Sequence, residues 1–164
     1  MIQRVFDARK RGFVCAAYES LNELGTRNTA VPATQAPGRL LAIDLGTKRV
    51  GIAICDELRI TVRPIETIQR RNWKDLLSRI IRHVSEFDAR GLVIGLPLNL
   101  NGSEGPAAVN AREVASKFER SLSVPVYLQD ERLTSEEAKS RANDDLDSEA
   151  AAIILRDFLS QPRS

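Results

Sequence analysis

Three acidic residues stand at the ends of expected structural elements, where side chains of a sheet can converge. Asp44 ends a short apolar run, Glu131 ends another that begins at Val124, and Asp147 begins an Ala- and Ile-rich segment. Divalent cations such as Mg2+ and Mn2+ prefer carboxylate oxygens, which they share with the phosphate oxygens of a substrate. Three converging carboxylates therefore suit metal-assisted hydrolysis of a phosphodiester bond.

Spacing alone leaves alternatives for each acid. Asp is a preferred N-cap residue, so Asp147 is explained equally well as the cap of a helix. Asp130 and Glu131 are adjacent on a strand and face opposite ways, and alternation alone does not say which of them joins a site. Asp44 points to the same side as apolar residues of its own strand, so its carboxylate needs a partner.

The apolar patterns that would position these acids predict an α/β fold. A strand hairpin is followed by an edge strand that contains Pro64, and a short continuous apolar run gives a central strand. Gly51 and Ala53 alternate with large residues, so one face of the hairpin is open to close approach. The expected strands are residues 40–44, 50–55, 61–68, 91–96 and 124–131. The expected helices are residues 73–87 and 106–118, one from the capping box of Thr134 and Glu137, and one from Asp147.

The chain of 164 residues has room for one domain with one core. Residues 1–38 show no sustained period and end in a Pro- and Ala-containing stretch, so we expect a disordered extension before a domain at 39–164. The net charge of +2 neither indicates nor excludes nucleic acid. No apolar run approaches the roughly 20 residues that a bilayer needs, and no secretory signal begins the chain. We expect a cytoplasmic protein without a membrane partner, in which Cys55 is a buried, reduced thiol.

Four motifs occur in one order within residues 39–160, about three quarters of the chain. They are LAIDLGTKRVGIA at 41–53, VIGLPLN with NGSEG at 93–105, DERLTS at 130–135, and DS before AAAIIL at 147–155. In this combination they resemble the YqgF family of pre-16S rRNA nucleases, which are also described as Holliday-junction-resolvase-like. The resemblance implies an RNase H-like fold, a mixed five-stranded sheet flanked by helices, and a nuclease that matures the 5′ end of 16S rRNA during ribosome biogenesis.

The resemblance also assigns roles to the acids and names partners. It implies that Asp44, Glu131 and Asp147 are the catalytic residues and hold a divalent metal, Mg2+ or Mn2+. The implied partners are pre-16S rRNA and pre-ribosomal particles, or branched DNA if the chain is a Holliday-junction-type resolvase.

Four polar residues near the acids are candidate substrate contacts. Lys48, Arg49 and Arg132 can bind phosphate, which positions nucleic acid without reading its sequence. For Lys48 a solvated surface charge is the simpler interpretation, whereas we assign Arg132 to phosphate. Asn99 begins a polar loop, residues 99–105, which either lines the site or caps the helix that follows.

Two residues of the first expected helix, His83 and Trp73, are expected to have structural rather than catalytic or binding roles. His83, the single histidine, lies beside the apolar stripe and is expected at the surface or its boundary. Trp73 belongs to the core face of the same helix, and stacking on a base is the less favoured role.

The chain departs from the family pattern before Asp147. Family members carry a longer segment with a basic loop there, whereas here residues 143–146, Asn-Asp-Asp-Leu, separate the two last expected helices. A short, acidic connection can hold Asp147 away from the other acids and weakens phosphate attraction. This leaves open a non-catalytic RNA-binding or ribosome-assembly protein with the same fold.

Overall fold

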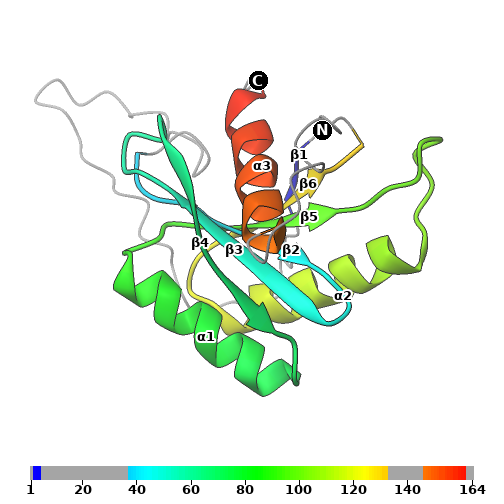
Figure 1. The fold of residues 1–164 in the computed structure, drawn as a ribbon, viewed down its shortest axis with the longest axis horizontal. Helices are drawn as coiled ribbons and strands as arrows, with labels where there is room; N and C mark the ends of the chain where they lie inside the picture. The colour runs from blue at the N-terminus through cyan, green and yellow to red at the C-terminus, as the bar shows by residue number, and fades with distance from the viewer. Residues whose placement is uncertain (1, 5–36, 133–145, 162–164) are drawn as a thin grey trace, which may run out of the picture. The chain divides into compact units, whose positions relative to one another are not determined.

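The computed structural model describes residues 2–4, 37–132 and 146–161, and its strands form one mixed sheet (Figure 1). The strand order is β1-β6-β5-β2-β3-β4. β2, β5 and β6 run parallel, and β3, β4 and β1 are antiparallel to their neighbours. The strands are β1 (Ile2–Arg4), β2 (Leu41–Leu45), β3 (Arg49–Cys55), β4 (Val62–Gln69), β5 (Leu92–Leu96) and β6 (Val126–Asp130).

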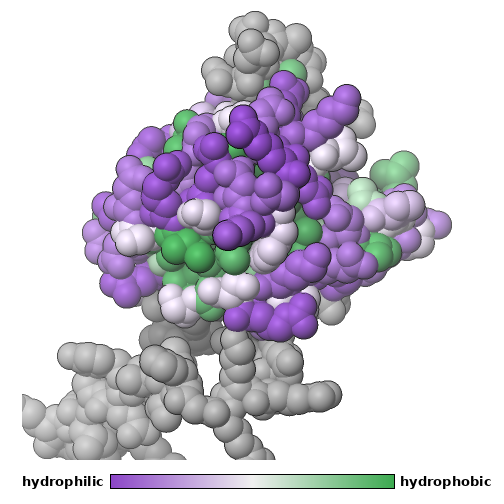
Figure 2. Space-filling model, turned by 90° about the horizontal axis from the view of Figure 1, so that it is seen from below, coloured by the Kyte–Doolittle hydropathy of each residue, from purple (hydrophilic) through white to green (hydrophobic). Residues whose placement is uncertain are grey.

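Three helices cover the two faces of this sheet. α1 (Trp73–Glu86) and α2 (Pro106–Ser121) lie on one face, and α3 (Leu146–Ser160) lies on the other (Figure 1). Strand alternation divides the core accordingly, because Ile43 packs with the side chains of α1 and α2 while its neighbour Ala42 packs under α3. Seen from the side of α1 and α2, the surface is mostly hydrophilic with a small apolar area (Figure 2).

The local patterns account for most of these elements. Asn72 caps α1 by accepting a hydrogen bond from the backbone N–H of Asp75, and Pro106 occupies the first turn of α2. β4 is the edge strand that Pro64 predicts, and its register with β3 shifts between Ile52 and Ala53. The α/β fold and the five strands expected from the sequence are confirmed.

The sheet has one strand more than the five expected. Residues Ile2–Arg4, which the sequence analysis assigned to an extension, form β1 and pair with β6, with Ile2 opposite Gln129. Three residues are too few to show an alternating pattern, so no sequence signal marks this strand. Residues 5–36 and the helix expected from Thr134 lie outside the described residues.

Two further findings concern the helices. None of those in the described part is long and apolar enough to cross a membrane. His83, expected at the surface or its boundary, is buried, with 5% of its surface exposed. Its Nε2 lies 2.7 Å from Oε1 of Glu66 on β4, so β4 covers this side of α1. Periodicity along α1 does not reveal this contact, since Glu66 lies on a separate element.

Candidate active site

Asp44 lies near the end of β2 on the face that α3 covers. Ala42 points to that face and Ile43 to the opposite one, so alternation places the Asp44 carboxylate with α3. Its partner on β3 is Gly51. On the other side, Ile43 pairs with Ile94 of β5, so Asp44 and Gly95 are the next residues along two parallel strands. The half-buried Asp44 therefore lies between two glycine positions.

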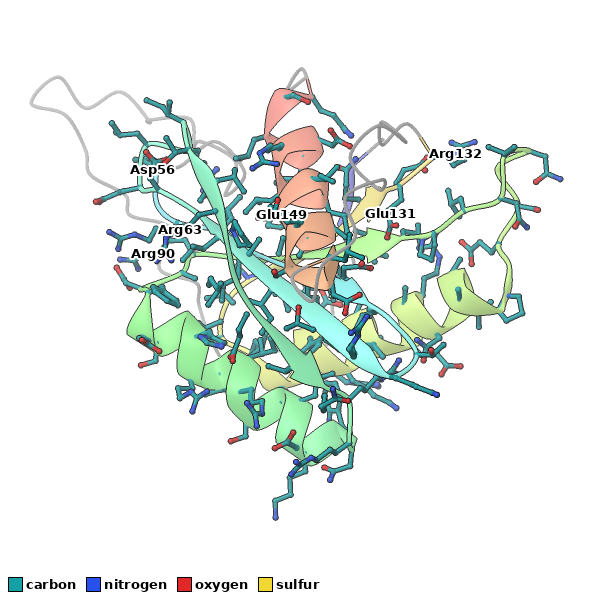
Figure 3. All side chains as sticks on the ribbon, viewed as in Figure 1. Asp56, Arg63, Arg90, Glu131, Arg132 and Glu149 are labelled. Atoms are coloured by element: carbon teal, nitrogen blue, oxygen red, sulfur yellow. The ribbon has the colours of Figure 1, made fainter. Side chains whose placement is uncertain are left out.

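Glu131 follows β6 and turns its carboxylate over β5. Tyr127 packs under α3, and alternation gives Glu131 the same face and Asp130 the opposite one. A Cβ atom on Gly95 would overlap Oε1 of Glu131 and would lie 2.7 Å from Cδ1 of Ile154. Figure 3 shows Glu131 beside α3. The geometry thus selects Glu131 over Asp130 as the acid that lies next to Asp44.

Asp147 reaches the same rim through the backbone of α3. A Cβ atom on Gly51 would overlap the carbonyl group of Asp147 and would lie 2.7 Å from the backbone nitrogen of Ser148. The first turn of α3 therefore packs on the residue that pairs with Asp44, which brings the backbone of Asp147 to this rim. α3 begins at Leu146, which places Asp147 inside the first turn rather than at the expected cap position.

The Asp147 side chain turns toward the β2–β3 turn. Its Oδ2 lies 2.6 Å from Nε of Arg49. This contact is an ion pair without hydrogen-bond geometry, since the buried Oδ2 accepts no hydrogen bond from the described residues. Both residues line a pocket of about 450 Å3, together with Gly46, Thr47, Lys48 and Gln69. Within the described ranges, no three His, Cys, Asp or Glu residues are grouped closely enough to hold a metal ion. The acids share one rim without forming a closed ligand group.

Arg132 is held by the acid next to Glu131 rather than by Glu131 itself. Its Nη2 lies 2.6 Å from Oδ2 of Asp130, and its backbone N–H donates to Oδ1 at 3.0 Å. The hydrogen bonds from Arg132 hold the pKa of the Asp130 carboxyl below its usual value of 3.8 and raise the pKa of the guanidinium. A Cβ on Gly102 would lie 3.0 Å from Nη1 of Arg132, so this side chain lies beside the polar loop.

Asn99 organises that polar loop. Its side-chain nitrogen donates to Oγ of Ser103 at 2.9 Å, and its carbonyl accepts from the N–H of Gly102 at 2.8 Å. Gly102 has a φ of 82°, a conformation that glycine adopts readily. The loop also caps α2, because its last residue, Gly105, is the N-cap and accepts a hydrogen bond from the N–H of Val109 at 3.1 Å, without a side-chain hydrogen bond.

Two glycines complete the site. The alternation of small and large residues in the hairpin pointed to Gly51, but nothing singled out Gly95 inside its apolar run. The contact between Gly95 and Glu131 joins residues that are distant in sequence, so only the fold reveals it.

A hairpin joined to parallel strands, with helices on both faces and acids at the strand ends, is the RNase H-like arrangement expected from the sequence. The family model described as "RuvX: Holliday junction resolvase" matches residues 38–161, and the chain belongs to this family. Two similar proteins carry the name "Putative pre-16S rRNA nuclease". The one from Anaeromyxobacter sp. (strain K) is 41% identical over 75% of this chain and 97% of its own length. The one from Roseiflexus sp. (strain RS-1) is 34% identical over 77% and 97%.

Among solved structures, the chain is similar to RuvC of Thermus thermophilus. The free protein matches with a TM-score of 0.48 and 12% identity, over 71% of this chain and 92% of RuvC. RuvC in complex with a Holliday junction substrate matches with a TM-score of 0.47 and 13% identity, over 71% of this chain and 91% of that chain.

Proposed function

We propose that this nuclease is metal-dependent and hydrolyses phosphodiester bonds at the 5′ end of pre-16S rRNA, in the cytoplasm and on pre-ribosomal particles. The observation that carries the proposal is the arrangement around Asp44. Gly51 and Gly95 flank it, and they bring the backbone of Asp147 and the carboxylate of Glu131 to the same rim. The names of the similar proteins supply the substrate.

The donor chemistry of the site fits a divalent cation. Asp44, Glu131 and Asp147 offer carboxylate oxygens, which Mg2+ and Mn2+ prefer, and the two glycines let α3 and the Glu131 carboxylate approach the strand that carries Asp44. When bound, such an ion activates water and stabilises the leaving oxygen. Arg49 offsets part of the negative charge that three neighbouring acids concentrate, through its ion pair with Asp147.

Other polar residues are proposed to position the substrate. Arg49 and the exposed Lys48 flank the pocket beside Asp147, and Arg132 and Asn99 lie on the opposite side of the rim. Cationic side chains at these places contact phosphate oxygens and fix the register of the strand that is cut.

Cleavage of a 16S precursor 5′ leader by the purified protein with Mg2+ or Mn2+ tests the proposal. Asp44→Asn is expected to lower the rate at least about 100-fold, because outer-shell partners of metal ligands alone are worth 10- to 100-fold. Asp88→Asn is the matched control: it removes one acid at an exposed position whose φ of 48° asparagine tolerates. Equal rates for Asp44→Asn and the wild type would contradict the assignment.

A second candidate is a junction-cutting DNA nuclease, which the family description favours. A four-way DNA junction in the same assay separates the two, since preferential cutting of the junction would replace pre-16S rRNA as the substrate. The ion pair of Asp147 with Arg49 favours a third candidate, a non-catalytic RNA-binding protein. Binding of the leader without cleavage of either substrate would support it.

A further inference from the structure

A second hollow, of about 280 Å3, lies on the far side of the β2–β3 turn from Asp147. It forms where this turn, the connection from β4 to α1, and the middle of α2 meet. No Asp or Glu of the described residues lines it, whereas three cationic residues do. We call it the basic groove and define it by Arg70, Arg71 and Lys117, with Thr47, Trp73 and Asn110 between them.

Arg70 is fixed by partners that leave its charge uncompensated. Its Nη1 donates to the carbonyl oxygen of Gly46 at 3.2 Å, and its Nη2 donates to Oδ1 of Asn110 at 3.1 Å. Both acceptors are neutral. A guanidinium held by neutral groups keeps a full positive charge in a set orientation, which suits recognition of a phosphate.

Lys117 is likewise held without an acid. Its Nζ lies 5.8 Å from the ring centroid of Trp73, and that ring packs against Phe118 with centroids 4.8 Å apart. The cation–π contact orients the ammonium group and leaves its charge in place. Glu113, one turn earlier on α2, does not line the groove.

The three cations of the basic groove share the lack of an acidic partner among the described residues. Arg70, Arg71 and Lys117 form no ion pair with a described carboxylate. Other arginines of the described residues do pair with Asp or Glu, namely Arg49, Arg79, Arg82, Arg90, Arg112 and Arg132. Uncompensated cations repel one another, so their clustering in one hollow points to an anionic ligand.

The basic groove is continuous with the candidate active site. Thr47 lines both the groove and the pocket that contains Arg49 and Asp147. The backbone N–H of Arg70 donates to the carbonyl of Lys48 at 2.8 Å, which fixes the two loops to each other. A cationic path therefore leads from Asp147 around the hairpin turn to Lys117.

The geometry points to a site for the sugar–phosphate backbone of the substrate, at nucleotides outside the cleavage position. This inference rests on the proposed function for the class of substrate and adds where the uncut part lies. Backbone contacts explain how a chain with a net charge of only +2 binds a polyanion, because three cations without acidic partners lie together in this groove.

The test measures binding of a 16S leader RNA, and of a DNA of the same sequence, without divalent metal in an Asp44→Asn background. The groove variant carries Arg71→Gln and Lys117→Gln. Its matched control carries Arg63→Gln and Arg90→Gln, whose side chains lie at the opposite side of the molecule from Glu131 (Figure 3). We expect the groove variant to bind both nucleic acids roughly 10-fold more weakly at low salt, with the slope of log K against log salt reduced by about two.

Separate readouts keep this inference distinct from the proposed function. If the groove variant matches the control in affinity and salt slope, the groove inference is overturned even where the wild type cleaves RNA. If only RNA binding falls, the contacts go to the 2′-hydroxyl and the phosphate assignment is wrong. If the wild type cuts nothing but the groove variant still loses binding, the groove inference holds and the catalytic proposal fails. If the double variant does not fold, the single variant Arg71→Gln, at an exposed residue of the groove, repeats the test against Arg90→Gln.

Discussion

At the residue scale, the charged groups of the rim differ in how their charges are compensated. Asp130 is matched by Arg132, and Asp147 by Arg49. The first pair lies on the face of β6 away from α3, and the second faces the hairpin pocket. Arg132 is therefore committed to a protein carboxylate before any nucleic acid arrives, which lowers its value as a phosphate ligand relative to the cations of the basic groove.

Asp157 on α3 gives a pH-dependent prediction. Burial raises the pKa of its carboxyl above the usual 3.8, and Arg156 partly opposes this shift. A raised pKa in the folded state means that the protonated form favours folding, an advantage present at low pH and lost as pH rises through the folded pKa. Asp157→Asn should therefore stabilise the protein at pH 7, by no more than about 0.5 kcal/mol because solvent screens a half-buried group, and should change little below pH 3.8. Urea unfolding at several pH values measures this, and a loss of stability at pH 7 would contradict it.

Individual residues show where sequence reasoning stops. Strand alternation predicts that Asp130 and Glu131 lie on opposite faces of the sheet. Choosing the acid that joins Asp44 requires knowing which face α3 covers. His83 was placed at the boundary because its own helix shows only its neighbours along the chain. Its burial depends on Glu66, which another element supplies. Residue types and spacing therefore predict candidates, and contacts between elements select among them.

At the element scale, the site depends on close approach of α3 and the end of β6 to the sheet. Gly51 admits the first turn of α3, and Gly95 admits the carboxylate of Glu131. The two glycines differ in what a methyl group would meet. At Gly51 the obstacle is the backbone of a helix, whereas at Gly95 it is the ends of two side chains.

Gly95→Ala and Gly51→Ala should therefore separate function from stability. Gly95→Ala displaces Glu131 at a cost of about 1–3 kcal/mol, typical of overpacking, and should reduce cleavage by about 100-fold, the effect of a small misplacement at a catalytic centre. Gly51→Ala must move α3 itself, so it should cost more than Gly95→Ala in the free energy of unfolding. Denaturant unfolding and the cleavage assay together measure both effects.

Gly105→Ala is the control for this comparison. Its new Cβ would meet only Asn99 atoms at 3.6 and 3.7 Å, which is ordinary contact distance. It should leave cleavage unchanged and change stability by no more than about 1 kcal/mol, because alanine fits the extended backbone at Gly105 while the N-cap position favours glycine. Full activity of Gly95→Ala would argue against a role for Glu131.

The elements themselves were predicted to different extents. The hairpin, α1 and β5 follow from periodicity, because each buries one clear apolar face or is buried on both. β1 was not predicted, because edge pairing with β6 uses backbone groups and leaves no pattern in three residues. The site was predicted as three acids at element ends, but the packing that joins them depends on the sheet order.

At the scale of the whole molecule, the core depends on one contiguous stretch of the chain. Among residues 37–132 and 146–161, whose burial the structure describes, the buried apolar side chains run from Leu40 to Phe158. Gly38 joins this stretch through its N–H to the carbonyl of Glu57 at 2.9 Å. The family match covers residues 38–161 and so coincides with it. Residues before Gly38 contribute β1 to the sheet and nothing else that the structure describes.

A chain that begins at Gly38 should therefore fold cooperatively without the first 37 residues. It loses the pairing of β1 with β6, which consists of three residue pairs. Because each hydrogen bond contributes a net of about 0.5–1.5 kcal/mol, we expect the free energy of unfolding to fall by about 1–3 kcal/mol. The loss leaves β6 as an open edge, so the truncated chain should also associate more readily at high concentration. Urea unfolding followed by circular dichroism, with sedimentation at two concentrations, measures both effects. A single transition at lower urea supports a domain that begins near residue 39, whereas a chain without a cooperative transition would show that β1 or the residues after it are part of the folding unit.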